Sequence, residues 1–311
     1  MAAAPTLESY PPRLSAPAPL GLIAGEGIFP HLVARGARAA GRPVICAAFG
    51  GSADASLEGE CDQFCWVGVA RLGQWVRVLK RGGCHEAIMV GRVIKTKMFS
   101  RFRYLQYVPD FRTLRLWFTE LRHDTRDQAV LFAIIRELSR EGITLIDSTA
   151  YSTDHLATEG VMTQRAPSEA QWSDARFGWQ LCQTLSRLDI GQSIAVLEKT
   201  VVAVEALEGT NAMVDRAGTV CKAGGWTLIK VSNVKQDMRV DVPTVGLMTI
   251  ERLHSAGGRC LVLEAGRTIL LEKPKVLELA DRLKIAIVGM TQERALAGLA
   301  ATTVNASSAE R

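Results

Sequence analysis

Short, nearly continuous apolar runs are the strongest pattern in the first half of the chain. Such runs are typical of strands that are buried on both faces. They cover residues 21–25, 43–49, 63–69, 86–93 and 143–148. Between them, apolar positions recur at helical spacing over 30–40, 72–83 and 126–142. Strands that alternate with helices predict a parallel α/β layer over this half.

The second half has a different order of elements, because strands and helices no longer alternate regularly. A polar segment, 149–170, separates it from the first half. The pattern predicts helices at 171–187, 249–257 and 275–283, and strands at 193–206, 226–231, 236–246, 260–266, 268–272 and 285–290. We therefore predict an α/β protein of two domains: a parallel sheet over 20–146 and a mixed α+β domain over 147–292. The ends, 1–19 and 293–311, are predicted to be disordered tails.

Composition limits the class of protein. With 311 residues and 48% hydrophobic content, the chain can bury the cores of two domains. No apolar run reaches the roughly 18–20 residues that a membrane span needs. The N-terminus lacks the apolar segment of a signal peptide, and the seven cysteines form no CxxC pair. These features predict a protein of the reducing cytoplasm.

The charge of the chain is unevenly distributed. The net charge is only +5, but residues 71–126 contain 13 Lys/Arg and 4 Asp/Glu. Aromatic and basic residues are interleaved over 94–118 within this region. Such a segment can stack nucleic-acid bases, lie on an anionic membrane, or be an irregular excursion with a solvated face. The sequence leaves these three readings open.

The first candidate site is the turn Gly25–Glu26–Gly27, between a predicted strand and a predicted helix. Free backbone N–H groups at such a helix start can bind a phosphate. The third glycine of a GxGxxG fingerprint is missing, and so is the Lys-Ser/Thr pair of a P-loop. A plain tight turn is the alternative.

Carboxylates in the second half form a second candidate site. Glu205 and Glu208 stand at a predicted strand end, before a Gly-Thr turn that leads into a helix. Residues 236–246, QDMRVDVPTVG, read as a strand that would carry Asp237 and Asp241 on one face. Two acidic strand ends that meet can hold Mg²⁺ for phosphoryl chemistry. Surface carboxylates are the alternative.

Five segments in order resemble one family. They are 21–30, 189–213, 230–246, 263–272 and the terminal IVGM at 287–290. Together they resemble the I-type UDP-2,3-diacylglucosamine pyrophosphatases of lipid A biosynthesis. The resemblance implies an N-terminal Rossmann-like domain, a lipid held between two domains, and a homodimer. It also implies Mg²⁺-dependent hydrolysis of UDP-2,3-diacylglucosamine to UMP and 2,3-diacylglucosamine 1-phosphate (lipid X).

The resemblance also implies roles for particular residues. Asp241 matches the essential acid of the family, and the expected metal ligands are Asp241, Glu205 and Asn211. The expected substrate-binding residues are Gly25, Gly27, Gln192, Gly209, Thr210, Lys230, Arg239 and Thr244. Lys230 and Arg239 are candidates to clamp phosphate oxygens, with an ordinary cross-strand salt bridge as the alternative.

Two departures from the family pattern keep a second hypothesis open. Asn211 stands where the family usually has Asp, and Asp127 is followed by Gln128 rather than by a second Asp. A non-catalytic protein of the same fold that binds a nucleotide or lipid is therefore the alternative to an enzyme. A nucleic-acid partner is not expected, because the basic region serves a phosphorylated membrane substrate equally well. We expect the protein in the cytoplasm, peripheral to the inner membrane.

Overall fold

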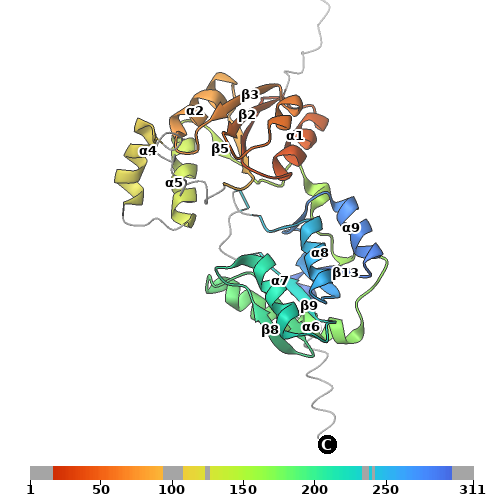
Figure 1. Cartoon of the computed structure of the whole chain (residues 1–311). Helices are drawn as coiled ribbons and strands as arrows, with labels where there is room; N and C mark the ends of the chain where they lie inside the picture. The colour runs from red at the N-terminus through yellow and green to blue at the C-terminus, as the bar shows by residue number, and fades with distance from the viewer. Residues whose placement is uncertain (1–16, 94–107, 123–126, 233–237, 240–241, 296–311) are drawn as a thin grey trace, which may run out of the picture.

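A five-stranded parallel sheet forms the centre of the N-terminal domain (Figure 1). The computed structural model describes residues 17–93, 108–122, 127–232, 238–239 and 242–295. The strand order is β3-β2-β1-β4-β5, so the sheet is wound outward in both directions from β1. The predicted Rossmann-like fold is confirmed by this order.

The elements of this domain follow the predicted alternation. The strands are β1 (Leu20–Ala24), β2 (Val44–Phe49), β3 (Gln63–Val67), β4 (Glu86–Val90) and β5 (Thr144–Leu145). The main helices are α1 (Phe29–Ala39), α2 (Leu72–Arg81) and α5 (Asp127–Arg140), and the 3-10 helix η1 (Ala55–Glu60) precedes β3. Helix α1 packs on one face of the sheet, whereas α2 and α5 pack on the other.

A helix that the sequence did not predict lies within the basic–aromatic stretch. Helix α4 (Phe111–Leu116) continues directly into a π-helical turn, η3 (Trp117–Leu121). Asp110 caps α4, because its carboxylate accepts the backbone N–H of Thr113 at 2.9 Å and that of Gly73 at 2.7 Å. This carboxylate thereby fixes the start of α4 against α2. Residues 94–107 of the stretch lie outside the described part of the chain.

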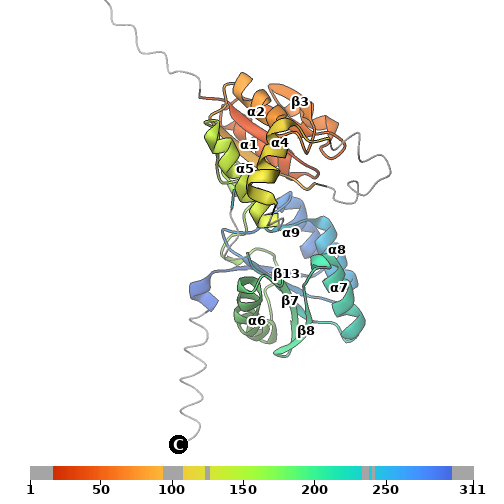
Figure 2. The same cartoon turned by 90° about the vertical axis from the view of Figure 1, so that its left-hand side faces the viewer.

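The C-terminal domain is built on a six-stranded mixed sheet, which confirms the predicted class. The order is β6-β13-β11-β9-β7-β8, in which β9, β11 and β13 are parallel. The strands are β6 (Gly160–Val161), β7 (Ser193–Leu197), β8 (Thr200–Val204), β9 (Thr227–Lys230), β11 (Cys260–Glu264) and β13 (Ala286–Met290). The helices are α6 (Glu169–Arg187), α7 (Gly209–Val220), α8 (Leu247–Ser255) and α9 (Lys273–Arg282), with the 3-10 turn η4 at Thr153–His155. Helix α6 covers one face, and α7, α8 and α9 cover the other (Figure 2).

The prediction of one strand over 193–206 was wrong, because this segment is a hairpin. Its two-residue turn, Glu198–Lys199, has positive φ at both positions (50° and 57°). The carboxylate of the buried Asp174 accepts both turn N–H groups, at 3.1 and 2.7 Å. This long-range acceptor stabilises a turn that has neither Asn nor Gly.

The prediction of one strand over 236–246 was also wrong. Met238 and Arg239 lie in a turn, and among the described residues of this segment only β10 (Thr244–Val245) is extended strand. Strand β10 pairs in parallel with β12 (Ile269–Leu270) in a separate two-stranded sheet. Asp237 and Asp241 lie outside the described residues, so the predicted face that they share remains a prediction.

Regular structure continues past the predicted end of the fold. Residues 292–295 are helical, Ala295 is fully buried against α6, and the Arg294 guanidinium lies 5.4 Å from the Trp172 ring centre. Part of the segment predicted as a tail therefore packs. At the other boundary, residue 147 falls between β5 and β6.

Candidate functional site between the two domains

A cavity of about 620 Å³ lies where the two domains meet. The N-terminal domain contributes residues 26–29, after β1, and 89–92, at the end of β4. The second half of the chain contributes Gln192, Lys230, the start of α7 and residues 242–244 and 246–249. This volume is in the range of small-molecule sites, which commonly lie between domains.

The N-terminal wall of the cavity is the switch point of the parallel sheet. Strands β1 and β4 are neighbours, but the chain leaves β1 for β2 on the opposite side. Ligands of such sheets bind outside the carboxyl ends of the strands at this point. Here the backbones of Glu26 and Arg92 exchange two hydrogen bonds, of 2.8 and 2.9 Å, which join the two strand ends.

Two glycines allow this close approach. A Cβ on Gly25 would lie 2.7 Å from the Arg92 carbonyl oxygen, and a Cβ on Gly91 would lie 2.6 Å from the Gly25 carbonyl carbon. Gly91 also has a φ of +93°. Gly25, a predicted substrate residue, thus has a clear structural part in the joining of β1 to β4. Gly27 lines the cavity itself, before the first turn of α1.

A buried polar chain forms the opposite wall. Lys230, only 4% exposed, donates from Nζ to Thr210 Oγ1 at 2.9 Å. The Thr210 hydroxyl in turn donates to Glu205 Oε1, also at 2.9 Å. Ser193, which faces Lys230 in the pairing of β7 with β9, has its Oγ 3.4 Å from Lys230 Nζ. Thr210 therefore orients an ammonium group and a carboxylate that are both buried.

The Glu205 carboxylate has one oxygen to spare. Within the described structure, Glu205 Oε2 is buried and accepts no hydrogen bond. Leaving a buried carboxylate oxygen without a partner is costly. The carboxylate lies behind Thr210 rather than in the cavity lining, and its observed role is to accept a hydrogen bond from the Thr210 hydroxyl.

Gln192 is placed by tight packing at the start of β7. A Cβ on Gly191 would lie 2.0 Å from the Glu205 carbonyl oxygen, so only glycine allows this approach. The Cys182 thiol donates to the Gln192 carbonyl at 3.3 Å. Burial raises the pKa of Cys182 to about 12, which keeps this thiol protonated as a donor. Gln192 Oε1 is itself buried without a partner in the described structure.

The start of α7 forms the rim of the cavity. Gly209 has a φ of +80°, and Thr210 and Asn211 follow it into the first turn. The Asn211 amide is exposed and lies 3.9 Å from Met248 Sδ. Glu208 pairs with Arg216 at 2.9 Å, on the next turns of the same helix.

Most of the predicted site residues converge on this cavity. Seven line it: Gly27, Gln192, Gly209, Thr210, Asn211, Lys230 and Thr244. Gly25 and Glu205 lie directly behind the lining, while Arg239 lies in the turn before it. Asp241 and the side chains of Asp127 and Gln128 lie outside the description. Their roles remain predictions.

Sequence reasoning missed the contribution of the β4 end, namely Gly91 and Arg92. The available signal was the pair Gly-Arg directly after a buried apolar run, which would have matched Gly25–Glu26 after β1. Parallel strand ends meet at one edge of a sheet, so glycines at two neighbouring ends indicate a close backbone approach. The contribution of Met248 had no comparable signal.

The residues present fit a magnesium ion that is shared with a phosphorylated ligand. Among the residues with described positions, no three His, Cys, Asp or Glu side chains form a metal cage. Mg²⁺ is usually held by one or two carboxylates together with substrate phosphates, so a cage is not required. The Glu26, Glu208 and Glu272 side chains line the cavity and can supply oxygen donors, and the unpartnered Glu205 oxygen lies behind the lining at Thr210.

No helix in the described parts is long and apolar enough to cross a bilayer.

Comparisons with known proteins agree with this architecture. The family model of the LpxI N-terminal domain matches residues 19–155, and that of the LpxI C-terminal domain matches residues 158–288. The chain is also 31% identical, over 286 residues, to a protein of Caulobacter vibrioides named UDP-2,3-diacylglucosamine pyrophosphatase LpxI. That match covers 88% of this chain and 99% of the Caulobacter protein. The resemblance is confirmed: this two-domain chain belongs to the LpxI family.

Proposed function

We propose that this protein hydrolyses UDP-2,3-diacylglucosamine to UMP and 2,3-diacylglucosamine 1-phosphate in lipid A biosynthesis. The observation that carries the proposal is the cavity between the domains, which joins a glycine-rich strand end to the buried Lys230–Thr210–Glu205 chain. The name of the Caulobacter relative, matched over nearly its full length, supplies the substrate class.

The groups around the cavity suit a pyrophosphate. The Lys230 ammonium can bind phosphate oxygens from one wall, and the start of α1, which lines the other wall, can offer free backbone N–H groups. In the reaction, water adds to one phosphorus and the P–O–P bond breaks, so that each product keeps one phosphate. Thr210 fixes the position of the ammonium group, because its hydroxyl accepts from Lys230 Nζ while it donates to Glu205.

Magnesium is part of the proposal. Asp241, Glu205 and Asn211 are the residues proposed to hold it, and Mg²⁺ would neutralise the pyrophosphate and polarise the phosphorus under attack. Asp241 would bind the metal or orient water. Asn211 keeps an oxygen donor at the rim but lacks the charge of the Asp that the family usually has. Asn211→Asp is therefore expected to lower the Mg²⁺ concentration that half-maximal turnover requires.

The proposed substrate is a membrane lipid with two acyl chains, and we propose that the enzyme meets it at the cytoplasmic face of the inner membrane. We also propose that it works there as a homodimer. Sedimentation equilibrium of the full chain measures the mass directly, and a monomer at every concentration tested would contradict the dimer.

The deciding experiment follows UMP release from UDP-2,3-diacylglucosamine by the purified chain. Turnover is expected with Mg²⁺, with loss on addition of EDTA and recovery when Mg²⁺ is restored. Asp241→Ala and Lys230→Met should each reduce turnover, while Leu188→Ser, an exposed change outside the cavity lining, serves as the control. Tight substrate binding without turnover under any divalent metal would instead favour the non-catalytic binding protein.

A further inference from the structure

An exposed apolar ridge runs along the outer side of α4 and η3. It consists of Phe111, Leu114, Trp117 and Phe118, which are 83%, 42%, 46% and 66% exposed. Their spacing places them on one side of the helix. The opposite side of the same helix is already buried, because Leu116 and Leu121 belong to the core of the N-terminal domain. The ridge is therefore a second apolar face, beyond what the domain core requires.

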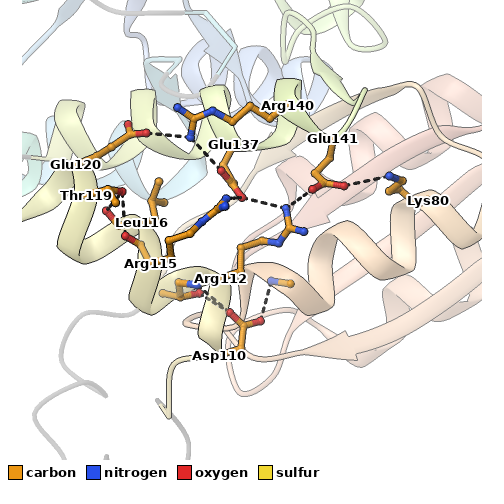
Figure 3. Close-up of polar contacts among 12 residues, drawn as sticks. Lys80, Asp110, Arg112, Arg115, Leu116, Thr119, Glu120, Glu137, Arg140 and Glu141 are labelled. Carbon is orange, nitrogen blue, oxygen red and sulfur yellow. Dashed lines mark hydrogen bonds and ion pairs between the residues drawn. The ribbon is translucent and has the colours of Figure 1, made fainter.

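A buried carboxylate holds this helix in place (Figure 3). Glu137 of α5 is fully buried and accepts from three guanidinium groups: Arg112 at 2.9 Å, Arg115 at 2.8 Å and Arg140 at 3.1 Å. Glu120 of η3 reaches back to Arg140 at 3.0 Å. These hydrogen bonds fix α4 and η3 on α5, so the helix that carries the ridge is held in one position.

The ridge has cations beside it. The side chains of Arg115, Arg136 and Arg140 are each more than half exposed, although each is ion-paired with Glu120 of η3 or Glu137 of α5. Aromatic side chains that enter a headgroup region, with arginines at lipid phosphates, are the composition of a membrane-surface helix.

Charge also distinguishes between two possible partners of the ridge, a membrane and a second copy of the chain. The described residues of 71–141, which include α2, α4, η3 and α5, carry ten Lys/Arg and six Asp/Glu. A twofold interface would bring this patch against itself, and like charges would repel. An anionic leaflet attracts the same excess, by about 1 kcal/mol per basic residue near the surface. The charge complementarity therefore favours lipid.

We propose that the ridge of Phe111, Leu114, Trp117 and Phe118 is the surface by which this protein docks on an anionic phospholipid membrane. The aromatic side chains enter the headgroup region, and the neighbouring arginines bind lipid phosphates. This inference rests on the proposed function in one respect: the diacylated substrate gives the enzyme a reason to bind a leaflet.

The test is cosedimentation of the full chain with vesicles of phosphatidylcholine mixed with phosphatidylglycerol, and with vesicles of phosphatidylcholine alone. The wild type should bind the anionic vesicles more tightly, and added salt should weaken this binding. Phe111→Ser combined with Phe118→Ser should weaken it by about tenfold for each ring removed. The matched control is Leu188→Ser combined with Val220→Ser, two similarly exposed side chains of the C-terminal domain, and it should bind as the wild type does.

Several results would overturn the docking surface. Equal vesicle binding by the ridge variant and the control would do so, as would no binding of the wild type to anionic vesicles. A ridge variant that turns a dimer into a monomer, in a wild type that ignores vesicles, would identify the ridge as a subunit interface.

Hydrolysis of detergent-dispersed substrate separates this inference from the proposed function. The ridge variant should turn over dispersed substrate like the wild type, which also shows that it is folded, and should lose rate only on substrate in vesicles. Absence of all turnover in the wild type would contradict the proposed function and leave the vesicle result to decide the ridge. Full turnover with ridge-independent binding would contradict the ridge alone.

Discussion

Replacing Thr210 by valine tests the buried polar chain directly. Valine keeps the branched shape of threonine and removes the hydroxyl, which accepts from Lys230 and donates to Glu205, each at 2.9 Å. Both of those partners are almost fully buried. The change therefore removes one hydrogen-bond partner from each of two charged groups that water cannot easily reach.

The size of the effect follows from these two contacts. A hydrogen bond to a charged group contributes about 1.5–3 kcal/mol, so the gross loss is about 3–6 kcal/mol. Lys230 and Glu205 can move together and regain part of it as a direct ion pair. We expect a net loss of about 2–3 kcal/mol in the free energy of unfolding, or about 4–12 °C in the melting temperature of this domain. The same movement withdraws Lys230 Nζ from the cavity, which should lower kcat by about 10–100-fold.

Urea unfolding and UMP release measure the two effects, and Thr210→Ser is the matched control. Serine keeps the hydroxyl and loses only the methyl group, so it should restore most of the stability and most of the rate. Valine behaving as the wild type in both assays would refute the polar chain as a working part of the site. Serine performing no better than valine would show that the methyl packing matters rather than the hydroxyl.

Three further predictions test other parts of the structure. Gly91→Ala should lower the free energy of unfolding by about 2–4 kcal/mol, measured by urea, because its Cβ would meet Gly25 at a positive φ; an unchanged midpoint would contradict the close approach. Asp174→Ala should cost about 1–3 kcal/mol in thermal unfolding, since two hairpin N–H groups lose their acceptor, and Asp174→Asn should cost less. Iodoacetamide at pH 8 should label the exposed Cys65 and spare Cys84, because burial raises the pKa of Cys84 to about 11 and its thiolate forms only at higher pH; mass spectrometry showing equal labelling of both would contradict this.

The parallel sheet was predictable because its signal is local. Strands that are buried on both faces must be apolar along their whole length, and the helices that cover them repeat at 3.6 residues. The glycine-rich turn after β1 was equally visible, since it needs no partner elsewhere in the chain to be recognised. The resemblance to a known family predicted a Rossmann-like class for this sheet, whereas the order of its strands was not predicted and comes from the structure.

The features that the sequence did not predict depend on partners far along the chain. The turn Glu198–Lys199 interrupts an apolar stretch without Gly or Asn, and the carboxylate that stabilises it comes from Asp174 on α6. Helix α4 presents aromatic groups outward, which hides its amphipathic pattern, and its main acceptor, Glu137, lies on α5. Local pattern cannot show a contact of this kind before the fold is known.

The small sheet of β10 and β12 explains why the cavity can be built from both domains. Alternate residues of this sheet pack in opposite directions: Ile269 belongs to the core around α1, whereas Val245 and Leu270 belong to the core around α7 and α8. It therefore joins the two hydrophobic cores, and burying its side chains on both faces resists separation of the domains.

For the site, the consequence is that the segment after β9 is anchored at the residues that line the cavity. Val242 packs against the N-terminal core and Thr244 lines the cavity, so this wall is fixed from the first described residue after Asp241. Lys230, at the end of β9, is fixed instead by the register of the C-terminal sheet, opposite Ser193. The proposed substrate thus meets two walls that are held differently. The segment with Thr244 is held by the junction of the two domains, and Lys230 is held by the C-terminal sheet alone. A substitution that weakens the packing of β10 and β12 should therefore change the distance between Thr244 and Lys230, while the structure around each of them is kept.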